Sequence, residues 1–385
     1  MRILIISDVP THPINAGNKR LINAYTTLFK EWGHEVHFLM INRYNMRPKY
    51  QKDTTEGIFC TSKEWGQFYH QYNYSTFENI KSNLNILLGK LLHNGYRKCD
   101  DIYPSGLHQT FLKLHKIYKF EAVIVNYFYL SKILEFIPLK KKSLFTHDSF
   151  SLNAKSSEHQ AAYYLTREEE KKALTRAPYI FAMQDIEAEY FKSLSPNSKI
   201  LINYSNFTYQ PQPCANNHNI LYLSGSSKFN KEGLDWFIND IFPSIKLKYQ
   251  DAKLYIAGSI CNILNEYQNN KDIELVGKIN NPYQFFLKGD IAINPCQHGS
   301  GLKIKTFEAM SYDKVVMTHP HSTIGIFNKD QAPIFSSIIA HEWITFIEKV
   351  WEQKDFLLQI KHQNRIYIKG MNSFIEKQYK TFLCS

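Results

Sequence analysis

Continuous apolar runs separated by a segment with helical periodicity dominate the start of the chain. Residues 2–7 (RILIIS) form one such run and residues 35–41 (EVHFLMI) form the next. Between them, apolar residues recur every three or four positions from Leu21 to Trp32, which predicts an amphipathic helix. An uninterrupted apolar run is typical of a strand buried on both faces. The pattern therefore predicts a βαβ unit and a doubly wound parallel sheet, whose ligands bind at the carboxyl ends of the strands.

The same alternation continues to residue 203 and then starts again. Further strands are expected within 121–130, 143–151, 179–184 and 199–203, and a second series at 220–225, 252–259, 273–279, 290–296 and 314–318. Residues 204–219 contain prolines and asparagines without periodicity, which indicates a linker. The fold class expected is α/β, with two Rossmann-like domains of similar size facing across a cleft.

Residues 42–104 do not follow this alternation. They are aromatic and basic, and they contain the amphipathic segment FENIKSNLNILLGKLL at 77–92. Two interpretations remain open for this region. It forms either a surface for an acceptor or a membrane, or ordinary helices packed on the sheet.

Composition and charge set the broad class. The chain has 385 residues, 44% of them hydrophobic and 21% charged, which is typical of a globular protein of two domains. The net charge of +11 suggests a polyanionic or phosphorylated partner, or only a lysine-rich surface. The six cysteines form no CxxC pair or zinc spacing, which fits a reducing compartment. We expect a cytoplasmic protein, with peripheral contact to the inner membrane face left open.

The stretch GSGLKIKTFEAMSYDKVV (299–316) carries the clearest chemistry. Gly299, Ser300 and Gly301 form a turn whose backbone N–H groups suit an anion, and a helix expected to begin near Leu302 adds its positive dipole end. The side chains that could act with this turn are Lys303, Lys305 and Glu308. Lys305 and Glu308 lie three residues apart on one helical face, as an anion-binding lysine and a ribose-binding carboxylate would. The alternative is a surface helix with a Lys–Glu pair.

Two candidates lie in the first half of the chain. Gly17 is in the first strand-to-helix loop, where a backbone can approach a phosphate or sugar, but no GxGxxG motif accompanies it. His147 and Asp148 come at the end of an expected strand, where an α/β sheet presents its site. His147 would bind substrate or transfer a proton, and Asp148 would orient it or cap the next helix.

These residues resemble glycosyltransferase family 4, the retaining enzymes of GT-B fold. The segment GSGLKIKTFEAMSYDKVVMT is similar to the family's E-x7-E region, with its second glutamate at Glu308. The segment ILYLSGSSKFNKEGLDWF resembles the first strand and loop of the family's donor domain. Weaker similarities are the GHEV of residues 33–36 and the THD of residues 146–148. Three positions depart from the family pattern: Ser300 replaces the first glutamate, Ser226 an arginine and Asp313 a glycine.

The resemblance implies specific roles and boundaries. Residues 1–203 would bind the acceptor, residues 204–365 the donor, and a helix at 366–385 would cross back to the first domain. The catalytic residues implied are His147, Lys231, Lys305 and Glu308. The donor-binding residues implied are Gly17, Gly225, Lys228, Gly299, Ser300, Gly301, Leu302 and Lys303.

The implied reaction is sugar transfer with retention from a UDP- or GDP-sugar to a glycan or lipid-linked acceptor. Bacterial surface polysaccharide synthesis is the implied pathway. No cofactor is expected, and no metal, because the chain lacks an Asp-x-Asp motif. The lysines would stabilise the departing diphosphate. The surplus of positive charge would suit an anionic membrane surface, and no nucleic acid is expected as a partner.

Three other interpretations compete with this one. A nucleotide-sugar epimerase of GT-B fold would need carboxylates and histidines around the sugar that the sequence does not place. A non-catalytic polyanion-binding protein would bind with strong salt dependence and without nucleotide preference. An inactive transferase would follow if the loss of the first glutamate at Ser300 abolished activity.

Overall fold

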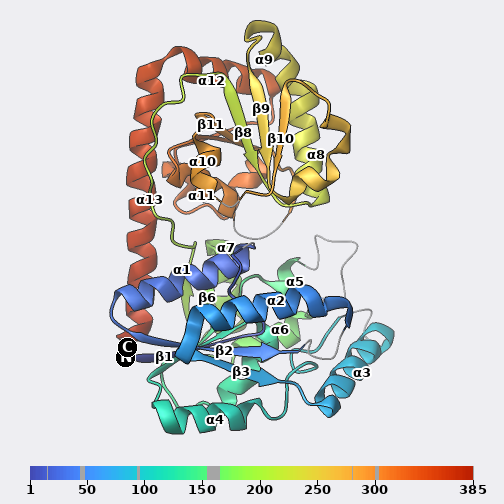
Figure 1. Ribbon diagram of the computed structural model, residues 1–385. Helices are drawn as coiled ribbons and strands as arrows, with labels where there is room; N and C mark the ends of the chain where they lie inside the picture. Colours follow the sequence, from blue (N-terminus) through green and yellow to red (C-terminus); the bar gives the residue numbers. More distant parts are fainter. Residues whose placement is uncertain are drawn as a thin grey trace. The chain divides into compact units, whose positions relative to one another are not determined.

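The computed structural model describes residues 1–14, 16–43, 48–92, 96–153, 165–279, 281–299 and 303–384 (Figure 1). Of residues 48–54 and 90 only the backbone is described. The chain forms two compact units. Unit 1 contains Met1–Asn206 and Ile375–Ser385, and unit 2 contains Phe207–Phe374. The long helix α13 (Lys354–Leu383) contributes residues to both.

Unit 1 is built on a parallel sheet with strand order β3-β2-β1-β4-β5-β6-β7 in its described residues. The strands are β1 (Arg2–Ser7), β2 (Glu35–Asn42), β3 (Tyr69–Asn73), β4 (Ala122–Asn126), β5 (Lys142–Phe145), β6 (Tyr179–Ala182) and β7 (Lys199–Ile202). The helices are α1 (Gly17–Glu31), α2 (Pro48–Trp65), α3 (Thr76–Leu92), α4 (Leu107–Tyr118), α5 (Phe150–Asn153), α6 (Arg167–Leu174) and α7 (Asp185–Leu194), with the 3-10 helices η1 (Gly66–Phe68) and η2 (Phe128–Phe136). Because the order reverses between β1 and β4, the topological switch point lies there.

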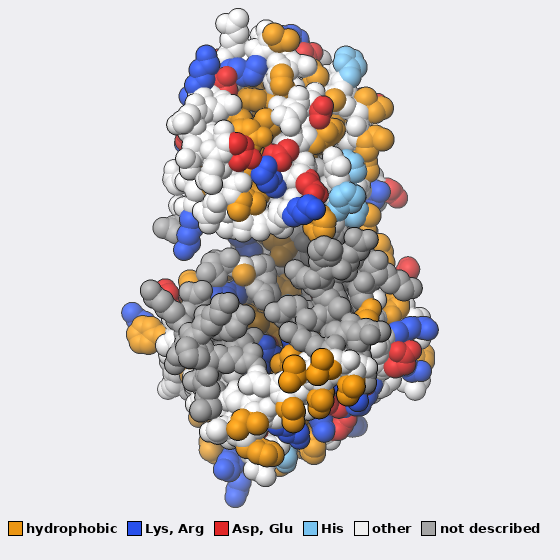
Figure 2. Space-filling view, turned by 90° about the vertical axis from the view of Figure 1, so that its right-hand side faces the viewer, with side chains coloured by type: hydrophobic (Ala, Val, Ile, Leu, Met, Phe, Trp, Pro, Cys, Tyr) orange, Lys and Arg blue, Asp and Glu red, His pale blue; other side chains and the backbone are white. Residues whose placement is uncertain are grey.

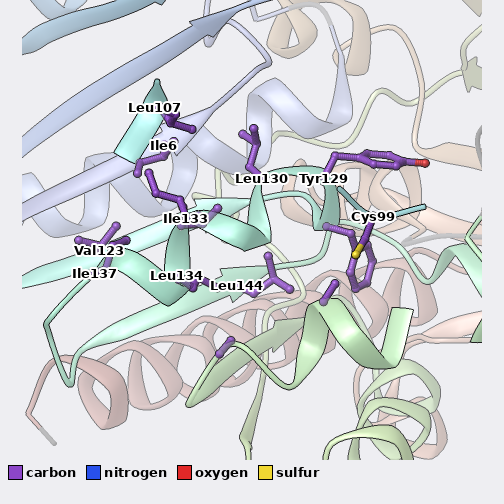
Figure 3. Close-up of a cluster of buried hydrophobic side chains, with 14 of the residues drawn as sticks. Ile6, Cys99, Leu107, Val123, Tyr129, Leu130, Ile133, Leu134, Ile137 and Leu144 are labelled. Carbon is purple, nitrogen blue, oxygen red and sulfur yellow. The ribbon is translucent and has the colours of Figure 1, made fainter. Parts of the chain in front are cut away.

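The core of unit 1 follows from the apolar runs of its central strands. Figure 3 shows one buried cluster, in which Ile6, Val123 and Leu144 meet side chains of η2 such as Ile133 and Leu134. All five of these side chains have no exposed surface. Strands that are apolar on both faces need such cover on each side, and η2 provides part of it.

Unit 2 repeats the same topology, with strand order β10-β9-β8-β11-β12-β13. The strands are β8 (Asn219–Leu223), β9 (Lys253–Ala257), β10 (Ile273–Gly277), β11 (Ile291–Asn294), β12 (Val315–Thr318) and β13 (Ile334–Ser336). The helices are α8 (Lys228–Trp236), α9 (Phe242–Lys248), α10 (Pro282–Phe286), α11 (Ile304–Ser311), α12 (Ala340–Glu352) and α13, with the π-helix η4 (Phe237–Ile241) between α8 and α9. The short 3-10 helices are η5 (Ser259–Ile263), η6 (Asn265–Tyr267), η7 (Pro320–Thr323) and η8 (Lys329–Gln331). The switch point of unit 2 lies between β8 and β11.

The two ends of α13 are held by different kinds of contact. In unit 2, the ammonium of Lys361 lies 2.9 Å from the carboxylate of Asp290, and both side chains are less than a tenth exposed. In unit 1, the ring of Tyr379 packs 5.1 Å from the rings of Phe29 and Phe181. The chain passes between the units at residues 206–207 and 374–375, whereas the sequence places these boundaries at 203–204 and 365–366.

Candidate active site

The switch point of unit 2 brings two helix N-termini together. The loop after β8 leads into α8, with Ser227 as N-cap, and the loop after β11 leads into α11. Neither helix has an acidic residue in its first turn. A helix N-terminus without acidic side chains attracts anions through its free N–H groups and its dipole. This edge of the sheet therefore suits a phosphate group.

Lys305 connects the two loops. Its ammonium donates hydrogen bonds to Oδ1 of Asn230, at 2.8 Å, and to Oγ of Ser224, at 3.3 Å. It also lies 5.4 Å from the ring centre of Tyr222. Burial lowers the pKa of Lys305 to about 8, with smaller contributions from neighbouring groups. The partners of this cation are neutral, so its charge stays available to an anionic ligand.

The loop after β8 is ordered by polar contacts that the sequence did not reveal. The amide of Asn230 donates to the carbonyl of Gly225 at 2.9 Å, and the backbone N–H of Ser226 donates to Oγ of Ser259 at 2.9 Å. Asn230 thus holds the loop with its nitrogen and Lys305 with its oxygen. Asn230 directly precedes Lys231, which the sequence predicts to bind phosphate. The same helical argument, shifted by one position, would have identified Asn230.

The two lysines of α8 occupy different surroundings from Lys305. Lys231 lies 2.7 Å from both Asp235 and Glu266. Burial lowers the pKa of Lys231, but the two carboxylates outweigh this effect and the pKa is raised overall. Lys228, the first residue of α8, is 85% exposed and lies 3.6 Å from Glu232. Phosphate binding by either lysine stays a prediction. For Lys231, an anion would have to compete with two carboxylates.

Of the turn that begins the stretch 299–316, only Gly299 and Lys303 are described. Gly299 has a φ of 115°, in the region that favours glycine. Its carbonyl accepts hydrogen bonds from Nε2 of His321, at 2.7 Å, and from Nζ of Lys303, at 3.3 Å. The expected donor ligands Ser300, Gly301 and Leu302 lie outside the described residues.

Helix α11 begins at Ile304, two residues later than expected, so Lys303 is in the turn and Lys305 in the helix. Glu308 lies one turn further along, with 6% of its surface exposed. The structure thus places Lys303, Lys305 and Glu308 in one segment, next to the loop that contains Gly225. A role for Glu308 toward ribose stays a prediction.

In unit 1, His147 lies beside the switch point between β1 and β4. Its Nε2 is 2.8 Å from Oδ1 of Asn126, and its ring stacks on Tyr127 at 4.2 Å between ring centres. Because Asn126 uses its amide nitrogen to donate to the carbonyl of Ile6, its oxygen must accept, and His147 is therefore protonated on Nε2. Burial lowers the pKa of His147 to about 3. The imidazole is neutral, with Nδ1 as a hydrogen-bond acceptor.

The loop that contains His147 is fixed by buried acids. Burial, followed by the nearby Asp148, raises the pKa of Glu187 to about 8, so these two carboxyl groups share a proton at neutral pH. The carboxylate of Glu170 accepts the backbone N–H groups of Phe150 and Ser151 at 2.9 and 3.2 Å. His147 itself has a φ of 63°.

Gly17 is the first residue of α1, close to the same switch point. The neighbouring Asn18 donates to the hydroxyl of Tyr127 at 2.8 Å, which connects α1 to the ring that covers His147. Within the described ranges, no three His, Cys, Asp or Glu side chains gather as metal ligands. No described helix is long and apolar enough to cross a bilayer.

Comparison with protein families identifies the class. Residues 217–334 match the family model described as "Glycosyl transferases group 1". This segment contains Lys305 and the three residues that contact its ammonium, Tyr222, Ser224 and Asn230. The match confirms the expected enzyme class, a glycosyltransferase, but it does not distinguish family 4 within that class. A comparison with curated protein sequences finds no match.

Solved structures match over the full chain. Sucrose-phosphate synthase from Thermosynechococcus elongatus has a TM-score of 0.66 and 12% identity, covering 99% of this chain and 98% of its own. A mutant of S. aureus TarM, in complex with fondaparinux, alpha-GlcNAc-glycerol and UDP, has a TM-score of 0.65 and 11% identity and covers 100% of both chains. Anabaena HepE in complex with UDP and glucose has a TM-score of 0.61 and 10% identity, covering 99% of both. These similarities confirm the expected fold, α/β of GT-B type.

Proposed function

We propose that this glycosyltransferase moves a sugar from a nucleotide diphosphate donor to a glycan or lipid-linked acceptor. The donor diphosphate binds at the switch point of unit 2. The transfer retains the anomeric configuration, needs no metal and serves the synthesis of a bacterial surface polysaccharide. UDP is the first nucleotide to test, because TarM and HepE were solved with UDP.

The observation that carries this proposal is the position of Lys305. Its ammonium joins the loops after β8 and β11 through Ser224 and Asn230, between two helix N-termini that lack acidic residues. Such an arrangement binds a diphosphate in the ground state. It stabilises the diphosphate more strongly as the bond to the sugar breaks and negative charge builds up on it.

Other residues complete the donor site in this proposal. The turn at Gly299, Ser300, Gly301 and Leu302 supplies backbone N–H groups, Gly225 allows the ligand to approach the backbone, and Lys303 and Lys228 add charge. Glu308 accepts hydrogen bonds from the ribose hydroxyls. Lys231 contributes less than Lys305, because two carboxylates already hold its ammonium.

His147 binds rather than transfers protons in this proposal. A neutral imidazole whose pKa is lowered to about 3 is a poor general acid or base near neutral pH. Its Nδ1 can accept a hydrogen bond from a sugar hydroxyl. Asn126 and Tyr127 would then act as positioning residues, because they fix the ring through Nε2 and through stacking.

Thermal stabilisation by nucleotides tests the donor site. A ligand that binds only the folded protein raises its melting temperature, so UDP, GDP, CMP and ADP are compared with wild type, Glu308→Gln and Lys305→Met. We expect a shift with one diphosphate, reduced in both variants. The matched control Lys329→Met removes a lysine from η8 and should keep the full shift. No shift with any nucleotide at millimolar concentration would refute the transferase proposal.

The salt dependence of binding separates this proposal from polyanion binding. A protein that only neutralises a polyanion loses affinity steeply with salt and does not discriminate between bases. Selection of one base among the diphosphates UDP, GDP and ADP, which carry the same charge, is expected here. Retention is then tested by assigning the anomeric configuration of the product by NMR.

A further inference from the structure

Helix α3 presents an apolar face to the outside of unit 1. Its 17 residues contain seven large apolar side chains that are between 41% and 71% exposed. They are Phe77, Ile80, Leu84, Leu87, Leu88, Leu91 and Leu92. In a helix of 3.6 residues per turn, these positions form one continuous stripe along the helix. Figure 2 views the side on which α3 lies and shows a group of orange apolar side chains there.

The face of α3 that packs on unit 1 is largely polar, apart from Ile86, which packs against the buried cluster of unit 1. Glu78, Asn79 and Ser82 are 7%, 6% and 3% exposed. The carboxylate of Glu78 accepts the hydroxyl of Tyr72 at 2.8 Å and the backbone N–H of Gly106 at 3.1 Å. The helix is therefore oriented opposite to an ordinary surface helix, with its apolar side outward.

These contacts fix the orientation of α3. Turning the leucines inward would pull Glu78 away from Tyr72 and Gly106 and leave their donors unpaired, which is costly for buried groups. On the same side, Asn85 donates to the carbonyl of Asp101 at 3.0 Å. A Cβ on Gly89 would lie only 3.0 Å from the carbonyl of Tyr96. These contacts therefore hold the apolar face of α3 outward in the folded protein.

The size and charge of this face indicate what covers it. The seven exposures amount to roughly 700 Å² of residue surface, against about 300–600 Å² for the largest apolar patch of a typical monomer. Lys81 is exposed within the stripe, and Glu78, the one acidic residue of α3, is buried. An apolar stripe with basic and no exposed acidic side chains is complementary to an anionic lipid surface.

We propose that α3 is an interfacial helix that docks unit 1 on an anionic lipid surface. The helix, about 25 Å long at 1.5 Å per residue, lies in the plane of the surface with its apolar stripe among the acyl chains. Lys81 reaches the headgroups. Docking deepens the proposed function, because it would bring the enzyme to a lipid-linked acceptor. The helix does not cross the bilayer.

Flotation with lipid vesicles tests the proposal. Full-length protein is mixed with vesicles of phosphatidylcholine alone or of phosphatidylcholine and phosphatidylglycerol. We expect flotation with the anionic vesicles and a loss of at least about tenfold in partitioning for Phe77→Ser/Leu91→Ser, given the apolar surface removed. Lys81→Glu should weaken binding to the anionic vesicles selectively. Both replaced apolar residues are 71% exposed, so the double variant should fold, as its melting temperature would verify.

The matched control replaces two equally exposed apolar residues of unit 2. Leu247 and Ile338 are 85% and 65% exposed, and Leu247→Ser/Ile338→Ser should float like the wild type. Wild-type protein that stays with neither kind of vesicle would overturn the proposal, and so would unchanged flotation of the α3 variant. A lipid-free wild-type dimer that Phe77→Ser/Leu91→Ser converts to a monomer in sedimentation would instead assign the face to a second copy and also overturn it.

The outcome is independent of catalysis. Vesicle binding is measured without a nucleotide, and nucleotide stabilisation is measured without lipid. A protein that floats but binds no nucleotide would keep the docking inference and refute the proposed donor site. The reverse result would keep the donor site and refute the docking of α3.

Discussion

The lowered pKa of Lys305 predicts that donor binding takes up protons. With a pKa of about 8 in the free protein, this side chain is half protonated at pH 8. A bound diphosphate would favour the charged form and raise the pKa again. Binding at pH 8 should therefore take up about half a proton through Lys305, and binding at pH 7 about a tenth.

The same reasoning gives the pH dependence of affinity. The charged fraction of Lys305 falls from about nine tenths at pH 7 to about one tenth at pH 9, so UDP should bind about tenfold more weakly at pH 9. Lys305→Met should remove this dependence. It should also weaken binding at pH 7 by roughly 1.5–3 kcal/mol, the contribution of a hydrogen bond to a charged group.

Isothermal titration calorimetry measures both quantities. Proton uptake follows from the binding enthalpy in two buffers of different ionisation enthalpy at pH 8. The matched control is Lys329→Met, which removes a lysine from η8 and should keep the proton uptake of the wild type. Equal uptake by wild type and Lys305→Met, or an affinity unchanged between pH 7 and pH 9, would refute the assignment of the diphosphate to Lys305.

Three further predictions concern stability in the full chain. The pKa of Glu187 is raised from 4.5 to about 8, so between these pH values the folded state keeps a proton that the unfolded state releases. The contribution of Glu187 to stability is therefore lost as pH rises through this window. Glu187→Gln should raise the melting temperature relative to wild type at pH 8 but not at pH 4. Lys361→Met should cost up to about 3–5 kcal/mol in urea unfolding, because the buried carboxylate of Asp290 loses the ammonium that contacts it and keeps only the charge of Lys314 nearby. Tyr379→Ala should cost roughly 3–5 kcal/mol, because it leaves a cavity in a site that is 1% exposed; a loss under 1 kcal/mol would show that the end of α13 is not part of that core.

The strands that are buried on both faces could be predicted from the sequence, as could the edge strands β7 and β10, whereas the edge strands β3 and β13 could not. β1 and β11 are uninterrupted apolar runs, and each strand lies within the predicted range. β3 has the sequence YHQYN and lies at the sheet edge, where one side faces solvent and no apolar run is needed. The run at 121–130 extends beyond its strand, because its last residues belong to η2, which packs on the same core.

Within the candidate site, residue types were easier to predict than side-chain directions. Lys231 and Asn230 are adjacent, and one helical position is a rotation of about 100°. That rotation points Asn230 toward Lys305 and Lys231 toward Asp235 and Glu266. The spacing in the sequence shows which residues share a face of α11. Which lysine has neutral hydrogen-bond partners depends on how α8 packs, and the sequence alone does not show this.

Position 313 shows how a departure from a family pattern can be compensated. Asp313 has a φ of 63°, in the left-handed region where the resembling family has glycine. Its carboxylate accepts the hydroxyl of Tyr209 and the backbone N–H of Gln212. These contacts depend on residues about a hundred positions away in the sequence, so the tolerance of this aspartate could not be inferred from its neighbours.

The two units place different polar side chains at the same topological position. At the switch point of unit 2, the first polar side chains belong to serine, asparagine and Lys305, between helix N-termini. At the switch point of unit 1, β1 is followed by Asp8, whose pKa is raised by burial, and β4 ends beside the neutral His147. In the proposed function the diphosphate is attracted by the ammonium of Lys305, whereas the second arrangement offers the buried carboxyl group of Asp8 and the neutral imidazole of His147, which suit hydroxyls. Because the backbone topology is the same in both, the difference in ligand chemistry must come from these few side chains, and exchanging the charge at Lys305 should remove it.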